Sequence, residues 1–313
     1  MSRRMEFSGG PQGTYRTDLA ASVTGLGGKV FYVNASAGGA NDVDSPFPDV
    51  DNCDLCFDTL QGAIDKCVSS RGDKIFVKGS EAVTSAVNFN KTGIHVKALD
   101  FGIDPMARGE YNAIYSETIV DGPVAIISAG CRIEGLGFAG DDATTGFFAG
   151  AALLIGGAAA GAFGVHLKNC RFPKWGLDNS HGLSIAGGAA VSNVLIEDCD
   201  FEGAFDSGIY VQGAVGHLQI KGCRFNLATY AVEFGAFADA GVNSQIIYGP
   251  GNITVTPTKG LNTGSNACKG MVCGNYFGTA VGTGTNDLNT ANMETAGYIM
   301  VGNEYATEGT GPT

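Results

Sequence analysis

The sequence is poor in charged residues, in tryptophan and in long apolar runs. Only 16% of the 313 residues are Asp, Glu, Lys or Arg, and there is a single tryptophan. No stretch approaches the roughly 18 consecutive apolar residues of a membrane-spanning helix, so we expect no membrane partner. The formal net charge is −12 at pH 7, and such an acidic chain is not expected to bind nucleic acid.

Glycine is abundant, and a six-residue pattern repeats along the chain. The 49 glycines are about twice the usual share of ~7%. The pattern is an apolar residue, any residue, a small or turn-forming residue, Cys, Leu or Asn, any residue, and an aromatic residue. Its eight copies begin at Val96, Ile133, Leu167, Ile196, Ile220, Ile247, Val272 and Met300. From the second copy on, the starts lie 24 to 34 residues apart, which indicates a solenoid.

Each copy predicts two strands joined by a sharp corner. Its inward positions are the first, fourth and sixth, so alternation with period two is interrupted by one three-residue step. Residues that enter left-handed backbone conformations at little cost stand at that step: Gly135, Asn169, Asp198, Gly222, Gly249, Gly274 and Gly302. A third strand follows, as in Leu183-x-Ile185. Three strands and about 25 residues per turn predict an all-β, single-stranded parallel β-helix of about eight coils.

The fourth positions of successive copies should form a row inside the column. Cys170, Cys199 and Cys223 occupy this row, and Asn275 and Asn303 continue it. Thiols one coil apart do not have the compact four-ligand arrangement of a zinc site, so we interpret the row as a ladder of buried side chains.

Three further cysteines lie near the start, as Cys53-x-x-Cys56 and Cys67. No fourth zinc ligand stands nearby, which leaves a disulfide to Cys67 or free thiols as alternatives. Nine cysteines leave at least one unpaired, so the sequence does not decide the redox state.

The outward positions carry charges whose sign alternates from coil to coil. The second positions read Lys97, Glu134, Lys168, Glu197 and Lys221, and the fifth positions read Arg171, Asp200 and Arg224. Opposite charges on neighbouring strands stabilise a sheet by roughly 0.2–1 kcal/mol per pair. We therefore interpret these residues as ion-pair ladders rather than as a catalytic cleft.

Three motifs stand near the start: Tyr32-Val33-Asn34, Thr59-Leu60-Gln61-x-Ala63-Ile64-Asp65 and Gly72-Asp73-x-Ile75-x-Val77-x-x-Gly79. In this order they resemble the opening of the pectate-lyase-like right-handed parallel β-helix superfamily, and the resemblance extends over roughly residues 30–305. It implies a first strand, a short helix that caps the open end of the column, and a first coil. The spacing of Leu60, Ala63, Ile64 and Cys67 agrees, because it places them on one helical face.

We divide the chain into an N-terminal arm (residues 1–28), a cap with the first coil (29–80), the β-helix (81–305) and a C-terminal tail (306–313). The arm lacks the apolar segment of a secretion signal. It carries Arg3, Arg4 and Arg16, which we expect to attach the protein to an acidic partner.

Enzymes of the resembled superfamily act on one outer sheet face with clustered carboxylates, a calcium site or a basic residue. If this chain is an enzyme, the candidates are Asp178, His181, Glu202 and Asp206. Two carboxylates about 5–9.5 Å apart would suit a glycosidase. The arginine and histidine motifs of pectate lyases and polygalacturonases are incomplete, however, so we favour no catalytic residue.

Sugar-binding grooves expose aromatic platforms, for which Trp175, Tyr210 and Tyr230 are the candidates. Asp141-Asp142 is the candidate calcium ligand pair, although Gly-Asp-Asp-Ala is also ordinary loop sequence. We expect no metal or other cofactor.

These features favour a structural protein on the surface of a virus particle, most plausibly a bacteriophage capsid decoration protein. Its arm would bind a capsid or tail protein. Small outward residues on the third strands, such as Gly156, Ser184 and Ala186, suggest close association into a homotrimer. The alternative is a tailspike, lyase or glycoside hydrolase that degrades a host surface glycan.

Overall fold

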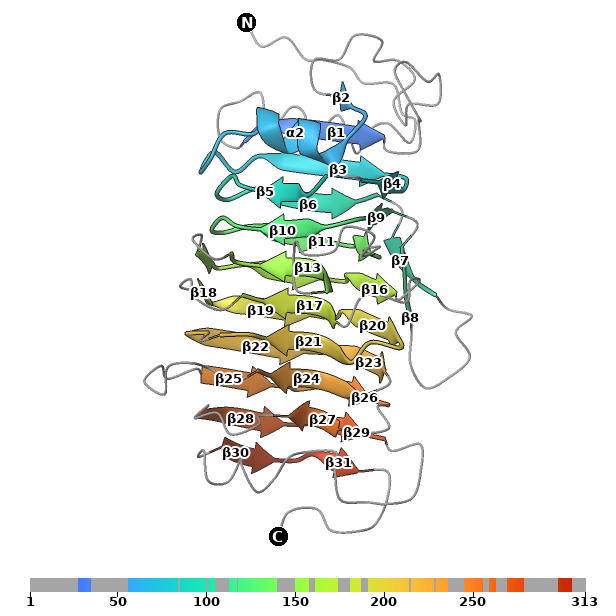
Figure 1. Ribbon diagram of the computed structural model, residues 1–313, viewed down its shortest axis with the longest axis vertical. Coiled ribbons are helices and arrows are strands. Elements are labelled where there is room, and N and C mark those ends of the chain that lie inside the picture. Colours follow the sequence, from blue (N-terminus) through green and yellow to red (C-terminus); the bar gives the residue numbers. More distant parts are fainter. Residues whose placement is uncertain are drawn as a thin grey trace, which may run out of the picture.

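The computed structural model is a column of stacked coils, with the N-terminal strands at one end and the C-terminal strands at the other (Figure 1). It describes residues 28–34, 56–83, 85–99, 101–104, 113–116, 118–139, 150–157, 161–173, 181–186, 191–213, 215–227, 229–235, 245–255, 259–262, 269–278 and 298–305. The arm residues Arg3, Arg4 and Arg16 therefore lie outside the described residues, as do Asp141 and Asp142.

Three parallel sheets run the length of the column. Sheet A contains, in spatial order, β2 (Cys56–Phe57), β1 (Val30–Asn34), β3 (Lys74–Lys78), β6 (His95–Ala98), β11 (Arg132–Glu134), β15 (His166–Lys168), β19 (Val194–Glu197), β22 (His217–Lys221), β25 (Gln245–Tyr248), β28 (Lys269–Cys273) and β30 (Tyr298–Val301). Sheet B contains β4 (Glu81–Ala82), β9 (Ile119–Asp121), β12 (Gly137–Phe138), β16 (Arg171–Pro173), β20 (Asp200–Gly203), β23 (Arg224–Leu227), β26 (Ile253–Thr254), β29 (Tyr276–Phe277) and β31 (Glu304–Tyr305). Sheet C contains β5 (Val87–Phe89), β10 (Val124–Ile126), β13 (Ala151–Ile155), β17 (His181–Ile185), β21 (Ser207–Val211), β24 (Tyr230–Phe234) and β27 (Lys259–Asn262).

Two small pairs lie outside these sheets. Strand β14 (Ala162–Phe163) pairs in parallel with β18 (Val191–Ser192), and β7 (Phe101–Asp104) pairs antiparallel with β8 (Ala113–Ser116). Strand β8 lies beside β16 at the side of the column (Figure 1). The order of the three long sheets confirms the predicted all-β parallel β-helix.

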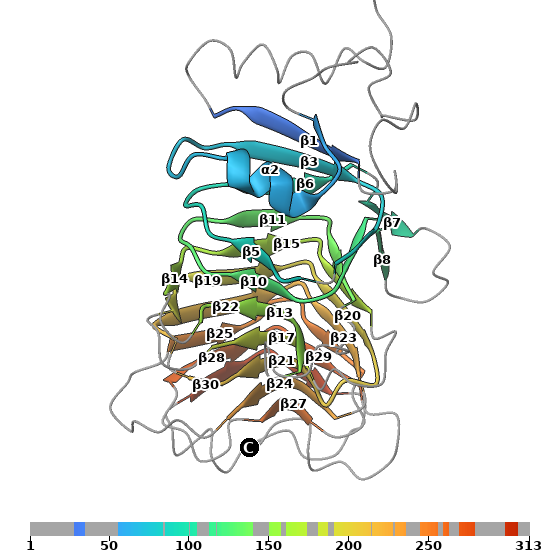
Figure 2. The same cartoon turned by 45° about the horizontal axis from the view of Figure 1, so that its top comes forward.

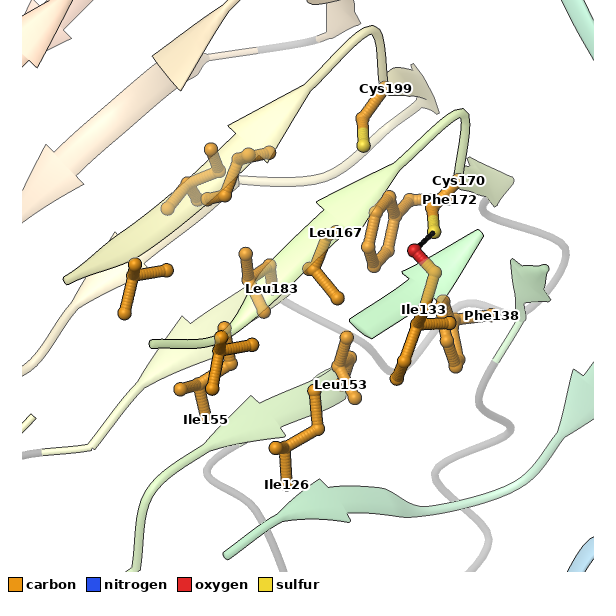
Figure 3. Close-up of a cluster of buried hydrophobic side chains, with 14 of the residues drawn as sticks. Ile126, Ile133, Phe138, Leu153, Ile155, Leu167, Cys170, Phe172, Leu183 and Cys199 are labelled. Atoms are coloured by element: carbon orange, nitrogen blue, oxygen red, sulfur yellow. Dashed lines mark hydrogen bonds between the residues drawn. The ribbon is translucent and has the colours of Figure 1, made fainter. Parts of the chain in front are cut away.

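The predicted inward residues fill the column. In Figure 3, Ile133 and Leu167 of sheet A, Phe172 of sheet B, and Leu153 and Leu183 of sheet C converge on one core, and all five are fully buried. The aromatic sixth positions stack from coil to coil, most closely where the Phe172 and Phe201 rings lie 4.4 Å apart and 2° from parallel. Burial of large side chains at every coil, at roughly 25 cal/mol per Å² of apolar area, supplies the main stabilisation of the column.

The predicted corners between sheets A and B have the expected left-handed backbone conformation. All seven corner residues have positive φ, from 51° at Asn169 to 117° at Gly249. A second left-handed row, which the sequence pattern did not reveal, precedes sheet A at Gly93, Gly130, Gly164 and Asn193.

Helix α2 (Leu60–Lys66) covers the N-terminal end of the column (Figure 2). Its predicted face is buried, including Cys67, whose thiol is free and donates to the Ala63 carbonyl. Thr59 caps the helix, and the buried carboxylate of Glu81 accepts a hydrogen bond from the Leu60 N–H. The cap predicted from the resemblance is therefore present.

Two copies of the repeat differ from the prediction. In the first, Ala98 rather than Leu99 is buried, and Phe101, predicted at the inward aromatic position of a coil strand, starts strand β7, which pairs antiparallel with β8. In the sixth, the strand register pairs Ile220 with Tyr248, so Tyr248 is the inward residue and Ile247 points outward. The prediction that Ile247 points inward, made from its place at the first position of the pattern, was wrong because the corner Gly249-Pro250-Gly251 contains one residue more than the other corners.

The shifted copy also lengthens the inner row. Asn252 was predicted at the aromatic position, but it lies next to Cys223 in the inner row that Cys170, Cys199 and Cys223 form. Thr254 occupies the aromatic position. The Tyr248 ring enters the aromatic stack between Phe225 and Phe277, and its hydroxyl lies 3.0 Å from Thr254 Oγ1. In this coil the aromatic stack is therefore continued by Tyr248 on β25 of sheet A, not by a residue on sheet B.

In the parts of the chain that the structure describes, no helix is long and apolar enough to cross a membrane.

Candidate functional site

The outer face of sheet C brings together most of the described candidate residues. Leu183, Ile209 and Val232 point into the core from β17, β21 and β24. The side chains between them therefore point outward, and Ser184 and Tyr210 lie opposite one another on neighbouring strands. This places polar and aromatic groups on three successive coils.

His181 and Tyr210 form the centre of the cluster. Their rings stack with centroids 4.2 Å apart and planes 13° from parallel, and both side chains are half-buried. Tyr230 lies one coil further along, where its strand pairs with the start of β21. The structure thus joins two predicted platform residues with a predicted catalytic candidate, while Trp175 lies outside the described residues.

Two hydroxyls and one carboxylate complete the cluster, and sequence analysis singled out none of them for chemistry. Ser207 is buried and its hydroxyl donates to the Glu233 carboxylate. Ser184 is also fully buried, and its Oγ has no hydrogen-bond partner. The arrangement can accept and donate hydrogen bonds beside an aromatic stack, but burial keeps the Ser207 hydroxyl from acting as an accessible nucleophile.

The predicted carboxylates do not converge. Asp178 lies outside the described residues. Glu202 lies on sheet B, where its Oε2 is 3.1 Å from Arg171 Nη2, so its charge is engaged in an ion pair. Asp206 is exposed in the turn before β21, and its backbone carbonyl accepts a hydrogen bond from the Tyr230 N–H. Among the described residues, the two predicted carboxylates Glu202 and Asp206 therefore lie in different settings, one in an ion pair on sheet B and one exposed in a turn.

Asp200 is the most unusual carboxylate of the described chain. It points outward from sheet B, as predicted, yet only 1% of the residue is exposed. One oxygen accepts a hydrogen bond from Arg224 Nε at 2.9 Å, and the other has no partner. Burial raises the pKa of this carboxyl above its ordinary value, although the neighbouring Arg224 charge opposes the shift. The sequence showed its pairing with Arg224 but contained no signal of its burial.

The outer face of sheet A carries the predicted ion-pair ladder. Lys97 and Glu134 approach to 3.1 Å, and Glu197 binds both Lys168 at 3.4 Å and Lys221 at 2.9 Å. The hydrogen bond from Lys221 is the largest influence on Glu197 and lowers its pKa to about 2. These contacts confirm a ladder of alternating charges that joins successive coils.

Histidines add to both glutamate clusters. His166 Nε2 lies 2.9 Å from Glu197, and His95 Nε2 lies 3.6 Å from Glu134. Burial lowers the pKa of both histidines. Both imidazoles are therefore mostly neutral near pH 7.

Within the described residues, no group of three or more His, Cys, Asp or Glu side chains is arranged to hold a metal ion.

The proposed trimer contact lies on the same outer face of sheet C, nearer its N-terminal end. Ala125, Leu154 and Ala186 pack into a small apolar cluster of their own and are between 1% and 8% exposed. This part of the face is therefore already buried within a single chain.

No protein-family model matches the sequence, and no curated protein matches it. Several solved structures share its fold. A pectin methylesterase from Aspergillus niger has a TM-score of 0.56 at 12% identity, over 90% of this chain and 87% of that one. Pectate lyase Pel9A has a TM-score of 0.50 at 13% identity, over 91% and 78%. ORF18 of Geobacillus virus E2 has a TM-score of 0.49 at 15% identity, over 97% and 66%, which is too low to support an argument about function.

Proposed function

We propose that this chain, which has the pectate-lyase-like parallel β-helix fold, is a structural protein that projects from the surface of a virus particle. The observation that supports this best is the use of its outward charges. On the described faces of sheets A and B, the charges of Glu134, Glu197, Asp200 and Glu202 are engaged in ion pairs, mostly from one coil to the next. Such pairs hold neighbouring coils in register, as a column requires, and leave few charges for a catalytic cleft.

A bacteriophage capsid decoration protein is the specific form that we propose. The N-terminal arm would bind a major capsid or tail protein through its arginines, and the column would point away from the particle. The chain would occur as a homotrimer. Since the small-residue face of sheet C is buried within one chain, a trimer would have to form through another surface.

The direct test is to count the protein in purified virus particles by quantitative mass spectrometry against the major shell protein. We expect parity with the shell protein or a simple fraction of it. A few copies per particle would indicate a spike or fibre instead, and absence from particles would contradict the proposal.

A second candidate function is binding or cleavage of a host glycan at the sheet C cluster. It is favoured by the His181–Tyr210 stack, which provides a flat aromatic surface beside the Glu233 carboxylate. Pectin methylesterase and pectate lyase, which share the fold, are named for carbohydrate substrates.

Binding to a polysaccharide array would test this candidate. His181→Ala and Tyr210→Ala should each weaken binding at least tenfold, whereas His217→Ala, a half-buried histidine on sheet A, should not. Cleavage that disappears in Asp206→Asn would identify an enzyme. The absence of both binding and cleavage across a broad panel would leave the structural function.

A further inference from the structure

The outer face of sheet A changes in character along the column. From β6 to β22 it carries the ion-pair ladder, but on the last three strands the outward residues that follow Gln245 and Lys269 are apolar. Ile247, Met271 and Ile299 lie side by side in one register row, and Cys273 and Val301 form the next. Met271 is 38% exposed, Ile299 60% and Val301 57%, while Ile247 and Cys273 are half-buried. We call these five residues the C-terminal patch.

The patch has the features of an interaction surface rather than of a solvated sheet face. It contains three of the five large exposed hydrophobic residues of the described chain, and contiguous exposed apolar groups usually mark a contact site. Strand β30 is also the last strand of sheet A. Edge strands are normally protected by charged side chains, yet Ile299 and Val301, which point outward from β30, are both aliphatic.

Opposite charges stand at the two ends of the patch. Exposed Lys269 precedes Met271 on β28, and exposed Glu304 follows Val301 just beyond the corner at Gly302. Because all strands of sheet A run in one direction, the lysine marks the start of the patch and the glutamate marks its far end.

This arrangement is complementary to itself. A two-fold axis that lies between the two faces, parallel to the column and perpendicular to the strands, turns the face of a second copy toward the first and reverses its strand direction. This brings the lysine of the second copy to the end where the first copy has its glutamate. The apolar centres then face one another and the charges meet at the rim, where polar groups normally lie in interfaces.

We propose that a second copy of this chain docks on the C-terminal patch about such a two-fold axis, with Lys269 of each copy facing Glu304 of the other. The contact alone produces a dimer. If the chain also forms a trimer through another surface, the two contacts produce a hexamer with D3 symmetry where the two-fold axes are perpendicular to the three-fold axis. The number of chains in the assembly is therefore even.

The test is the mass of the full chain in solution, measured by sedimentation velocity from 1 to 100 µM. Ile299→Lys and Val301→Lys place a charge in the centre of the patch, and each should raise the dissociation constant at least tenfold. Val68→Lys is the matched control, because Val68 is 50% exposed and lies at the opposite end of the column. It should leave the dissociation constant unchanged. Circular dichroism of each variant would verify the fold.

A charge exchange tests the orientation of the two copies. Lys269→Glu and Glu304→Lys should each weaken the contact about threefold to tenfold, and the double variant should restore it.

Three outcomes would overturn the proposal: a monomer at 100 µM, an assembly with an odd number of chains, or an even assembly that resists Ile299→Lys and Val301→Lys. Failure of the double variant to restore the contact would overturn the two-fold arrangement. None of these results bears on the copy number in virus particles, so this proposal and the proposed function can fail independently.

Discussion

The two halves of the column hold their coils in register by different means. In the N-terminal half, from β6 to β23, the ladder row inside contains cysteines and the outer face of sheet A carries ion pairs. In the C-terminal half, from β25 to β31, the row contains asparagines and the outer face is apolar. The directional polar contacts between coils thus lie mainly outside in one half and inside in the other.

The inner contacts differ in strength as well as in place. Cys170 and Cys199 donate only to carbonyls at 3.3 Å or more, and a thiol is a weak donor. Asn275 accepts from the Asn252 N–H at 3.3 Å and donates to the Tyr248 carbonyl at 2.9 Å and to Asn303 Oδ1 at 2.9 Å. Asn275 therefore binds both a backbone N–H and a backbone carbonyl of the preceding coil, whereas the thiols of Cys170 and Cys223 only approach a carbonyl of the preceding coil, at 3.7 Å.

This comparison shows two ways of adding directional contacts between coils to the burial of the inward residues, which itself specifies the register of each strand. A coil with an inert thiol inside can obtain them from charges outside. A coil with an amide ladder inside has no such requirement, and its outer face is available for a partner.

Removing an amide from the inner row should have the largest effect. We expect Asn275→Ala to lower the free energy of unfolding by roughly 2–4 kcal/mol, because it leaves the buried Asn252 N–H and Tyr248 carbonyl unsatisfied. Urea denaturation followed by circular dichroism measures this. Asn226→Ala, an exposed asparagine on β23, should change little, and a loss below about 1 kcal/mol for Asn275→Ala would contradict the comparison.

Acid should weaken the N-terminal half through Glu197. Its pKa is lowered from 4.5 to about 2, first by the hydrogen bond from Lys221 and further by the hydrogen bond from His166 and the charges of Lys168 and Lys221. The stabilisation is therefore fully present above pH 4.5 and is lost as the pH falls towards 2. It amounts to no more than about 3 kcal/mol. Glu197→Gln should remove this part of the pH dependence in denaturation curves between pH 6 and 2, whereas Asp58→Asn, at an exposed residue outside the ladder, should not. Equal curves for Glu197→Gln and the parent chain would rule out the ladder as the source.

Removing a thiol from the inner row should cost less than removing an amide. We expect Cys199→Ala to lower the free energy of unfolding by about 1 kcal/mol, since it deletes one buried atom and a weak hydrogen bond. The same urea denaturation experiment measures this change. A loss of unfolding free energy as large as that of Asn275→Ala would show that the cysteine and asparagine rows stabilise the column equally.

The smallest expected effect is a loss of local stability at high salt, in the N-terminal half of the column. Raising the ionic strength from 0.05 to 0.5 M should reduce the local stability around β11, β15 and β19 by less than about 1 kcal/mol, through screening of exposed pairs. Amides of β25 and β28 should be unaffected. Hydrogen exchange resolves both regions in one experiment, and a uniform response would contradict the assignment of charges to one half.

Much of the column was predictable because each coil repeats the same local pattern. The inward rows, the left-handed corners and the alternating charges on sheet A follow from residue type and spacing alone, whereas the capping helix was implied by the resemblance of residues 30–79 to a known superfamily. The sixth copy failed because its corner holds an additional residue, which moves Tyr248 inward and Ile247 outward. A one-residue shift reverses the face of every following side chain in a strand, and the spacing of neighbouring copies varies too widely to reveal it.

The site was less predictable than the fold. Sequence analysis named His181, Tyr210 and Tyr230, and the structure places them on one sheet face. The sequence did not reveal that Glu202 binds Arg171, that Glu233 accepts a hydrogen bond from Ser207, or that Asp200 is buried. These facts depend on which side chains of neighbouring coils face each other, and on what covers an outward face.

The sequence by itself determined the β-helical architecture and its charge ladders, because these depend on periodicity and on the conformational preferences of single residues. Only the tertiary structure decided which outward residues are covered and which stay exposed. Exposure depends on how the loops and coils pack together, and the same alternating pattern leaves Asp200 buried on sheet B and Ile299 open on sheet A.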